Sequence, residues 1–301
     1  MTVATLNLDN LKRHVGRTET STDVVTAAQA NLLRLTFGRP EPELADGDAL
    51  PPGWHVIYFT PRVPTSELRP DGTPARSGVT PDMPLPRRMF AGQAFRFHRP
   101  LRIGQALRQE TELTDIALKT GGTGTMVFTT VVSRIYGPDG LAVEDERRIV
   151  YREEVKAGER NQAPRREPAP TDAPWRRTVT AEPIVLFRFS ALTFNSHKIH
   201  YDRQWATETE GYPALVVHGP FTQTLLIDFA RDHAEGRAFK SFITQARAPL
   251  FEGVSFELRG RPRAIGPGGP TAKDPQTPSG CDLWAVTPEG TVAMSAQAEF
   301  A

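Results

Sequence analysis

Two histidines, an amide and a carboxylate lie within ten residues of this sequence, between Thr193 and Asp202. His197 and His200 are three residues apart, and a third histidine, His218, follows in the segment 216–220. Imidazoles change charge near neutral pH and so can transfer protons, and three of them can also bind zinc. The chain has no Gly-x-Ser-x-Gly elbow, so these residues favour proton transfer or metal binding over a serine nucleophile.

A structural role for the same residues is a further interpretation. Three scattered histidines occur in many proteins that bind no metal, and partly buried histidines can cap the end of a helix. Taken alone, this structural interpretation is at least as good as a catalytic one, and we expect no metal and no other cofactor.

An internal repeat bears on the choice between the catalytic and the structural interpretation. Three pairs of segments recur at similar offsets: 100–104 with 249–253, 138–140 with 288–290, and 35–38 with 192–195. The third pair aligns Gly38 with Asn195, yet only Asn195 is followed by histidines. Helix packing alone therefore does not require this crowding, which favours catalysis by the second half of the chain.

The elements that must position these residues follow the same order twice. In the first half we expect a helix over 24–37 after the start signal Ser21-Thr22-Asp23, a buried strand or loop anchor at 54–59, and strands at 93–98, 105–116, 126–136 and 141–152. In the second half we expect helices at 182–192 and 221–232, and strands at 239–246, 253–261, 281–287 and 291–300. A Gly/Pro-rich loop over 265–280 separates two of these strands.

This order predicts an α+β fold in which an antiparallel sheet wraps a helix, used twice. Residues 1–155 and 175–301 would be the two halves, and the polar, proline-rich segment 156–174 would link them. Joining the sheets edge to edge protects their exposed edges and makes a pseudo-dimer within one chain.

Composition excludes several classes of partner. The 36 basic and 35 acidic residues nearly cancel, so no net field attracts nucleic acid or a membrane surface. Cys281 is the single cysteine, and no segment has the roughly 20 apolar residues that span a bilayer. We expect a cytoplasmic protein, and the excess of arginine over lysine fits a GC-rich bacterial genome. The oligomeric state is not fixed, and a homodimer is one assembly that the sequence allows.

The segment 189–202, together with Val217-His218-Gly219-Pro220, resembles the hydratase-2 motif of MaoC-like hot-dog enzymes. The match is best to a branch with asparagine in place of the usual aspartate, which holds type 2 3-hydroxyacyl-thioester dehydratases and mesaconyl-C4-CoA (3-methylfumaryl-CoA) hydratases, with itaconyl-CoA hydratases close by. First-half segments 15–19, 85–92 and 97–101 look like the N-terminal domain of this branch. The resemblance implies a double hot-dog hydro-lyase acting on coenzyme A thioesters.

In the wider family an aspartate and a histidine, five residues apart, hold the water that adds across the double bond. These positions are Asn195 and His200 here, and the family's intervening asparagine is His197. An asparagine cannot accept a proton as a base at neutral pH, so the family's shared base does not carry over whole. We expect His200 to be the general base and acid, Asn195 to orient the water, and His197 to tune His200 or hold substrate. Gly219 and His218, at a helix start, would bind the thioester carbonyl.

A C5 dicarboxylic acyl group, in mesaconyl-C4-CoA or itaconyl-CoA, carries a carboxylate that needs a cationic partner. The family-like segments offer Arg17, Arg87 and Arg88, and Tyr201 is a further candidate for substrate contact. Both thioesters would give citramalyl-CoA. A dehydratase of fatty acid metabolism, a hot-dog thioesterase and a non-catalytic acyl-CoA binding protein stay open as alternatives.

Overall fold

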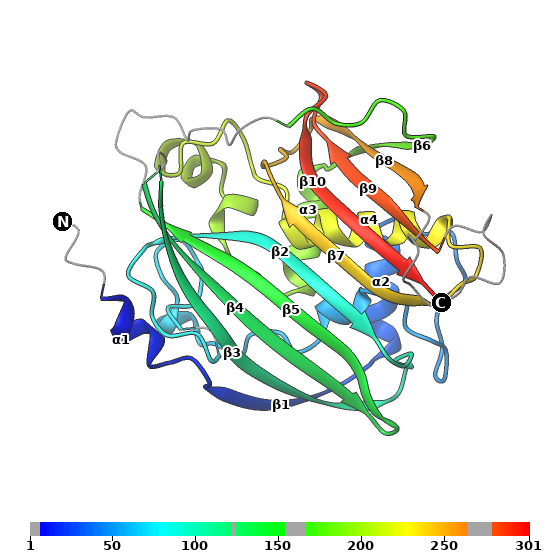
Figure 1. The fold of residues 1–301 in the computed structure, drawn as a ribbon, viewed down its shortest axis with the longest axis horizontal. Helices are drawn as coiled ribbons and strands as arrows, with labels where there is room; N and C mark the ends of the chain where they lie inside the picture. The colour runs from blue at the N-terminus through cyan, green and yellow to red at the C-terminus, as the bar shows by residue number, and fades with distance from the viewer. Residues whose placement is uncertain (1–6, 77, 122–123, 154–166, 264–278) are drawn as a thin grey trace.

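The computed structural model describes residues 7–76, 78–121, 124–153, 167–263 and 279–301. Their strands form one antiparallel ten-stranded sheet in the order β1-β3-β4-β5-β2-β7-β10-β9-β8-β6, which curves across the molecule in Figure 1. The two halves meet where β2 pairs with β7, from Gly92 opposite Gln245 to Arg96 opposite Ser241. The expected edge-to-edge union of two sheets is therefore confirmed.

The strands of the first half are long and those of the second are shorter. The first five are β1 (Thr18–Val24), β2 (Arg87–Phe97), β3 (Ala106–Gly121), β4 (Gly124–Gly137) and β5 (Gly140–Arg152). The second five are β6 (Trp175–Thr180), β7 (Phe239–Ala246), β8 (Ser255–Arg263), β9 (Gly280–Val286) and β10 (Val292–Phe300).

Three helices pack together beside this sheet. The helices are α1 (Leu8–Lys12), α2 (Ala27–Thr36), α3 (Pro183–Leu192) and α4 (Gly219–Asp232), of which α2, α3 and α4 share one apolar core. Short helical turns lie at η1 (Trp54–Ile57), η2 (Thr65–Glu67), η3 (Lys198–His200) and η4 (Trp205–Thr209). The helix α4 buries Leu226, Phe229 and Ala230, so it is the helix that the second-half sheet wraps.

Each half has an isolated β-bridge at a corresponding place, and the two halves differ in the helix that follows it. Ala49 bridges to Arg102 in the first half and Val216 bridges to Phe251 in the second. Three residues beyond Val216 the chain begins the 14-residue helix α4, whereas beyond Ala49 it forms only the four-residue turn η1. The helix that would fill the concave face of the first-half sheet is thus reduced to one turn.

Several boundaries differ from the sequence-based expectations. The residues Ser21 to Asp23 belong to β1, and the helix begins after Thr26, whose hydroxyl accepts the Gln29 N–H. The Asp23 carboxylate accepts the Phe59 N–H instead of capping a helix. The edge strands β1 and β6 were not predicted. Within the predicted linker, Ala169 is buried against Val286 and Val292.

Two predicted segments fall partly outside the described residues: 154–166 of the linker region and 264–278 of the Gly/Pro-rich loop. Among the described residues, no helix is both long enough and apolar enough to cross a membrane.

Candidate active site

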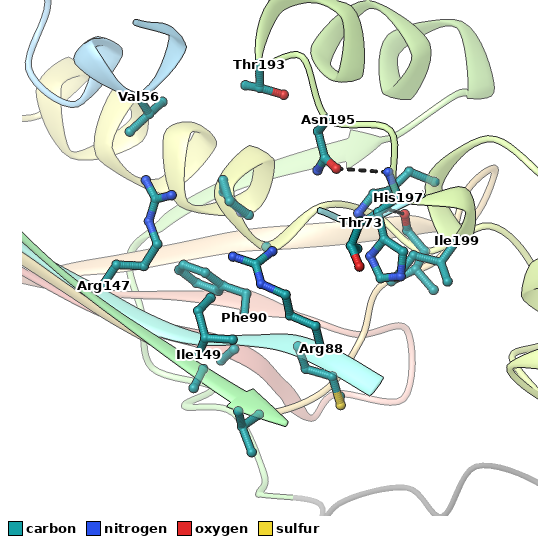
Figure 2. Close-up of a pocket in the computed structure, with 18 of the residues that line it drawn as sticks. Val56, Thr73, Arg88, Phe90, Arg147, Ile149, Thr193, Asn195, His197 and Ile199 are labelled. Carbon is teal, nitrogen blue, oxygen red and sulfur yellow. Dashed lines mark hydrogen bonds between the residues drawn. The ribbon is translucent and has the colours of Figure 1, made fainter. Parts of the chain in front are cut away.

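A cavity of about 1180 Å³ lies between the concave face of the first-half sheet and the segment that carries the histidines. Its walls come from both halves, because β2, β4 and β5 line one side and residues 193–200 line another (Figure 2). The turn η1 lines this cavity through His55 and Val56, at the place where the second half has the full helix α4. Asn195, His197 and His200 all line this cavity.

The turn after α3 sets the position of Asn195. The helix ends at Leu192, and Phe194 then adopts a left-handed conformation with φ 49°, which is rare for a bulky side chain. This turn lets the Asn195 N–H donate to the Ser190 carbonyl oxygen at 2.8 Å. Strain of this kind is concentrated at functional sites.

The side chain of Asn195 is held by the main chain. Its Oδ1 accepts the His197 N–H at 3.1 Å, shown by the dashed line in Figure 2. The amide nitrogen then remains as a donor at the edge of the cavity. Such a group can orient a water molecule by donating to its oxygen, and it cannot remove the water's proton.

The ring of His200 has a fixed tautomer. Its Nδ1 lies 2.7 Å from the Val216 carbonyl oxygen, so Nδ1 carries the proton and Nε2 keeps a lone pair. Burial, followed by the neighbouring His197, lowers the pKa of His200 to about 3. His200 is therefore neutral at physiological pH and can accept a proton at Nε2.

His218 lies behind His200 and outside the cavity lining. It is fully buried, its ring stacks on that of His200, and its Nε2 lies 2.8 Å from the Ser190 hydroxyl. Burial lowers its pKa well below the ordinary value, with His200 as a second cause. His218 thus supports the ring of His200 from one face, and it is not placed to touch a thioester as the sequence suggested.

His197 is also buried, next to His200. Burial lowers its pKa to about 3, and the charge of Arg88 adds to this effect. Its Nε2 lies 3.8 Å from Oδ2 of Asp71, a first-half carboxylate. Its ring is 5.5 Å from that of His200, edge to face.

The start of α4 also lines the cavity. Gly219 is its first residue, and the N–H groups of a first helical turn lack intrahelical partners. A Cβ at Gly219 would lie 2.6 Å from Cδ1 of Phe90, so only glycine allows this close contact with β2. The partial positive charge of a helix start suits an oxyanion.

The arginines singled out in the sequence separate in the structure. Arg88 lines the cavity, and its Nε is buried with no hydrogen-bond partner among the described residues. In contrast, the buried Arg87 donates to Glu210 at 2.8 Å and to the Tyr212 hydroxyl at 3.2 Å. Arg17 and Tyr201 are exposed, and neither belongs to the cavity lining.

Arg147 is another arginine of the cavity lining that the sequence analysis missed. Arg147 on β5 lies on the opposite side of Phe90 from Arg88, as Figure 2 shows, and its Nε is likewise buried without a partner in the described part of the chain. Its Nη2 lies 3.7 Å from Asp145. Asp71 was also missed, because it lies in a proline-rich stretch that gave no pattern for a strand or helix.

No group of three or more His, Cys, Asp or Glu side chains within the described ranges is arranged to hold a metal ion. The site instead combines a neutral base, an amide donor, helix N–H groups and an arginine around one cavity. This set can activate water, hold it, and stabilise negative charge on a carbonyl oxygen.

Solved structures define the class of this fold. A MaoC-like dehydratase matches 96% of this chain and 99% of its own with a TM-score of 0.70 and 15% identity. A conserved protein of Mycobacterium tuberculosis, described as a double hot-dog fold, matches 95% of this chain and 96% of its own with a TM-score of 0.51 and 15% identity. The protein has a MaoC-like double hot-dog fold, as the resemblance implied.

Sequence comparison places the chain within this class. The family model for hydroxyacyl-thioester dehydratase type 2 matches residues 53–252, and the chain belongs to this family. The mesaconyl-C(4)-CoA hydratase of Chloroflexus aurantiacus is 43% identical over 291 residues, which are 95% of this chain and 96% of that protein. The protein is therefore a hydro-lyase of the kind that acts on thioesters, and the expected reaction class is confirmed.

Proposed function

We propose that this protein adds water reversibly across the double bond of a C5 dicarboxylic enoyl-CoA, with mesaconyl-C4-CoA as the preferred substrate. The observation that carries the reaction is the fixed tautomer of His200, which keeps the Nε2 lone pair on a ring that lines the cavity together with Asn195. The identity to the Chloroflexus hydratase supports this choice of substrate.

The reaction follows from the positions of these groups. The Asn195 amide donates to the water oxygen while His200 Nε2 takes one proton of the water, and the oxygen bonds to the β carbon. The electron pair of the double bond moves onto the thioester as an enolate, which the Gly219 N–H and the positive end of α4 stabilise. The imidazolium of His200 then returns the proton to the α carbon. Burial lowers the pKa of His200 to about 3, and the negative charge of the enolate favours the imidazolium as it forms.

The carboxylate of mesaconyl-C4-CoA is attached to the β carbon, so it must lie close to the water and the histidines. Arg88 suits this position, because its charge acts on His197 and its guanidinium points into the space between Phe90 and His197 in Figure 2. Arg87 is engaged by Glu210, and Arg17 lies outside the cavity lining. We therefore assign the carboxylate to Arg88.

Dehydration of a 3-hydroxyacyl thioester is a second candidate. The family model carries this activity in its description, and the cavity of about 1180 Å³ exceeds what a C5 acyl group needs. The same residues serve both directions of the reaction, so the two candidates differ in the acyl group rather than in the mechanism.

Incubation with mesaconyl-C4-CoA, itaconyl-CoA, crotonyl-CoA and a long-chain 2-enoyl-CoA, followed by mass spectrometry, tests the proposal. We expect the fastest gain of one water from mesaconyl-C4-CoA. Faster hydration of the long-chain thioester would select the second candidate. Release of free coenzyme A without hydration would indicate a thioesterase, and no reaction with any thioester would indicate a binding protein.

A further inference from the structure

A loop of the first half, which lacks the histidine motif, contacts the segment that carries the proposed hydration site. Residues 69–73 form a tight turn in which the Arg69 N–H donates to the Thr73 carbonyl oxygen and the Gly72 N–H donates to the Arg69 carbonyl oxygen, both at 2.8 Å. We call these five residues the Asp71 loop. Both Asp71 and Thr73 are buried, at 8% and 3% exposure.

The Asp71 loop docks directly on the segment that carries the histidines. The Lys198 N–H donates to the Asp71 carbonyl oxygen at 2.8 Å, and the Ser196 hydroxyl donates to the Gly72 carbonyl oxygen at 2.6 Å. Gly72 has φ +84°, and a Cβ there would lie 1.9 Å from the Ser196 carbonyl oxygen. These contacts flank His197 on both sides in sequence, so the loop fixes the backbone from which that ring extends.

The carboxylate of Asp71 has two different surroundings. Its Oδ1 accepts the Thr73 N–H and the Thr73 hydroxyl, both at 2.8 Å. Its Oδ2 lies 3.8 Å from Nε2 of His197. This distance is longer than a hydrogen bond, and hydrogen bonds of a catalytic site commonly shorten when substrate binds.

The other charged and titratable groups described around His197 are arginines and histidines. Among the described residues, Asp71 is the one acidic side chain within ion-pair distance of His197. The remaining groups that act on the ring are Arg87, Arg88 and His218, and His200 packs against its edge. Asn195 occupies the position of the family's aspartate, so the carboxylate beside the reacting water comes from elsewhere or is missing.

We propose that Asp71 is a positioning residue that replaces this aspartate from the other half of the chain. Its Oδ2 holds the neutral ring of His197 with the proton on Nε2, which leaves Nδ1 as an acceptor for the water that Asn195 and His200 share. The site is then assembled from both halves: the first supplies the carboxylate and the second supplies the ring. This assignment rests on the proposed hydration reaction.

Substitution Asp71→Asn tests the proposal, because the amide keeps an oxygen for Thr73 and removes the charge that faces His197. We expect kcat for mesaconyl-C4-CoA to fall by about tenfold with little change in KM. Asp82→Asn is the matched control: Asp82 is an exposed carboxylate that pairs with Arg69 of the same loop. The control is expected to keep the wild-type kcat.

The double variant separates positioning from simple loop stability. If Asp71 acts through His197, Asp71→Asn causes little further loss in a His197→Gln background. A tenfold loss in both backgrounds would assign Asp71 a purely structural role and overturn the proposal. So would an Asp71→Asn enzyme that matches wild type.

The tautomer of His197 gives a readout that does not depend on activity. Two-bond ¹H–¹⁵N correlation spectra of the wild-type protein should show His197 protonated on Nε2, and Asp71→Asn should shift this population toward Nδ1. A wild-type His197 protonated on Nδ1 would contradict the proposal even if the variant failed to fold. If no thioester is hydrated, the proposed function fails, while this measurement still decides the role of Asp71.

Discussion

The imidazole of His200 stacks on that of His218, with ring centroids 3.6 Å apart and the planes inclined by 19°. Two imidazolium ions at this distance would repel each other, and burial already disfavours the charge on each ring. The packing of the site therefore requires neutral histidines, which links catalysis to the stability of the fold.

Stability should fall steeply in mild acid. The pKa values of His197, His200 and His218 are lowered by folding, so the unfolded chain binds more protons once the pH drops below about 6.5. Stability from these groups is fully present above pH 6.5 and is lost toward pH 3, at up to about 1.4 kcal/mol per pH unit for each histidine. Urea unfolding at pH 7, 6 and 5 measures this slope.

His197→Gln should reduce the part of that slope due to His197, His200 and His218 by up to about one third, because it removes one of these three rings. His98→Gln is the control, since His98 is exposed and pairs with Glu144 at the surface. An unchanged slope in the His197 variant would show that this ring is not neutralised by folding.

The pH profile of kcat/KM should lack a limb near pH 6.5. His200 is the proposed base, and its pKa of about 3 keeps it competent throughout the neutral and mildly acidic range. His200→Gln should lower kcat by about 10²- to 10⁴-fold while the far-ultraviolet circular dichroism is unchanged. Near-normal hydration by this folded variant would remove His200 from the mechanism.

Arg88→Gln should lower selectivity for dicarboxylic thioesters. Loss of one charged hydrogen-bond donor to the carboxylate predicts a fall of about 10- to 100-fold in kcat/KM for mesaconyl-C4-CoA, with a much smaller change for crotonyl-CoA. Arg147→Gln is the matched variant, because Arg147 lines the same cavity on the other side of Phe90. If Arg147→Gln shows the selective loss instead, the carboxylate binds on that side.

Gly219→Ala should damage both the fold and the reaction. The new methyl group would meet the ring of Phe90 at 2.6 Å, so α4 or β2 must shift, at a cost of about 1–3 kcal/mol in the free energy of unfolding. Adding Phe90→Leu should recover much of the stability. Thermal unfolding and kcat/KM of the single and double variants measure the loss and the recovery. If the double variant shows no recovery, the strain does not come from the contact with Phe90.

Much of the fold could be predicted because hydrophobic periodicity and the internal repeat mark most strands and both helices of the second half. The edge strand β1 was missed because the sequence Ser21-Thr22-Asp23 is also a good helix start. These residues form a strand and not a helix because they pair with β3, and this pairing cannot be read from the local sequence. Likewise, β6 follows a polar segment and pairs with β8, 75 or more residues away.

The histidines and Asn195 could be found because they are close in sequence, whereas Asp71 lies more than 120 residues from its partner and carries no local pattern. The sequence identified Arg87 and Arg88 as candidates but did not show which of them lines the cavity. Residues 87 and 88 begin strand β2, and successive side chains of a strand point to opposite faces. Only one of the two can line the cavity, but the predicted strand began at residue 93, so the sequence did not separate them.

The one-turn η1 has a consequence for how this chain came to be useful. The first half has the short turn η1 where the second half has the full helix α4, and the cavity that the histidines line lies beside that turn. Restoring a full helix after Trp54 would make the two halves more alike. The added helix would fill the cavity, and the histidines would then have no space in which to bind a substrate.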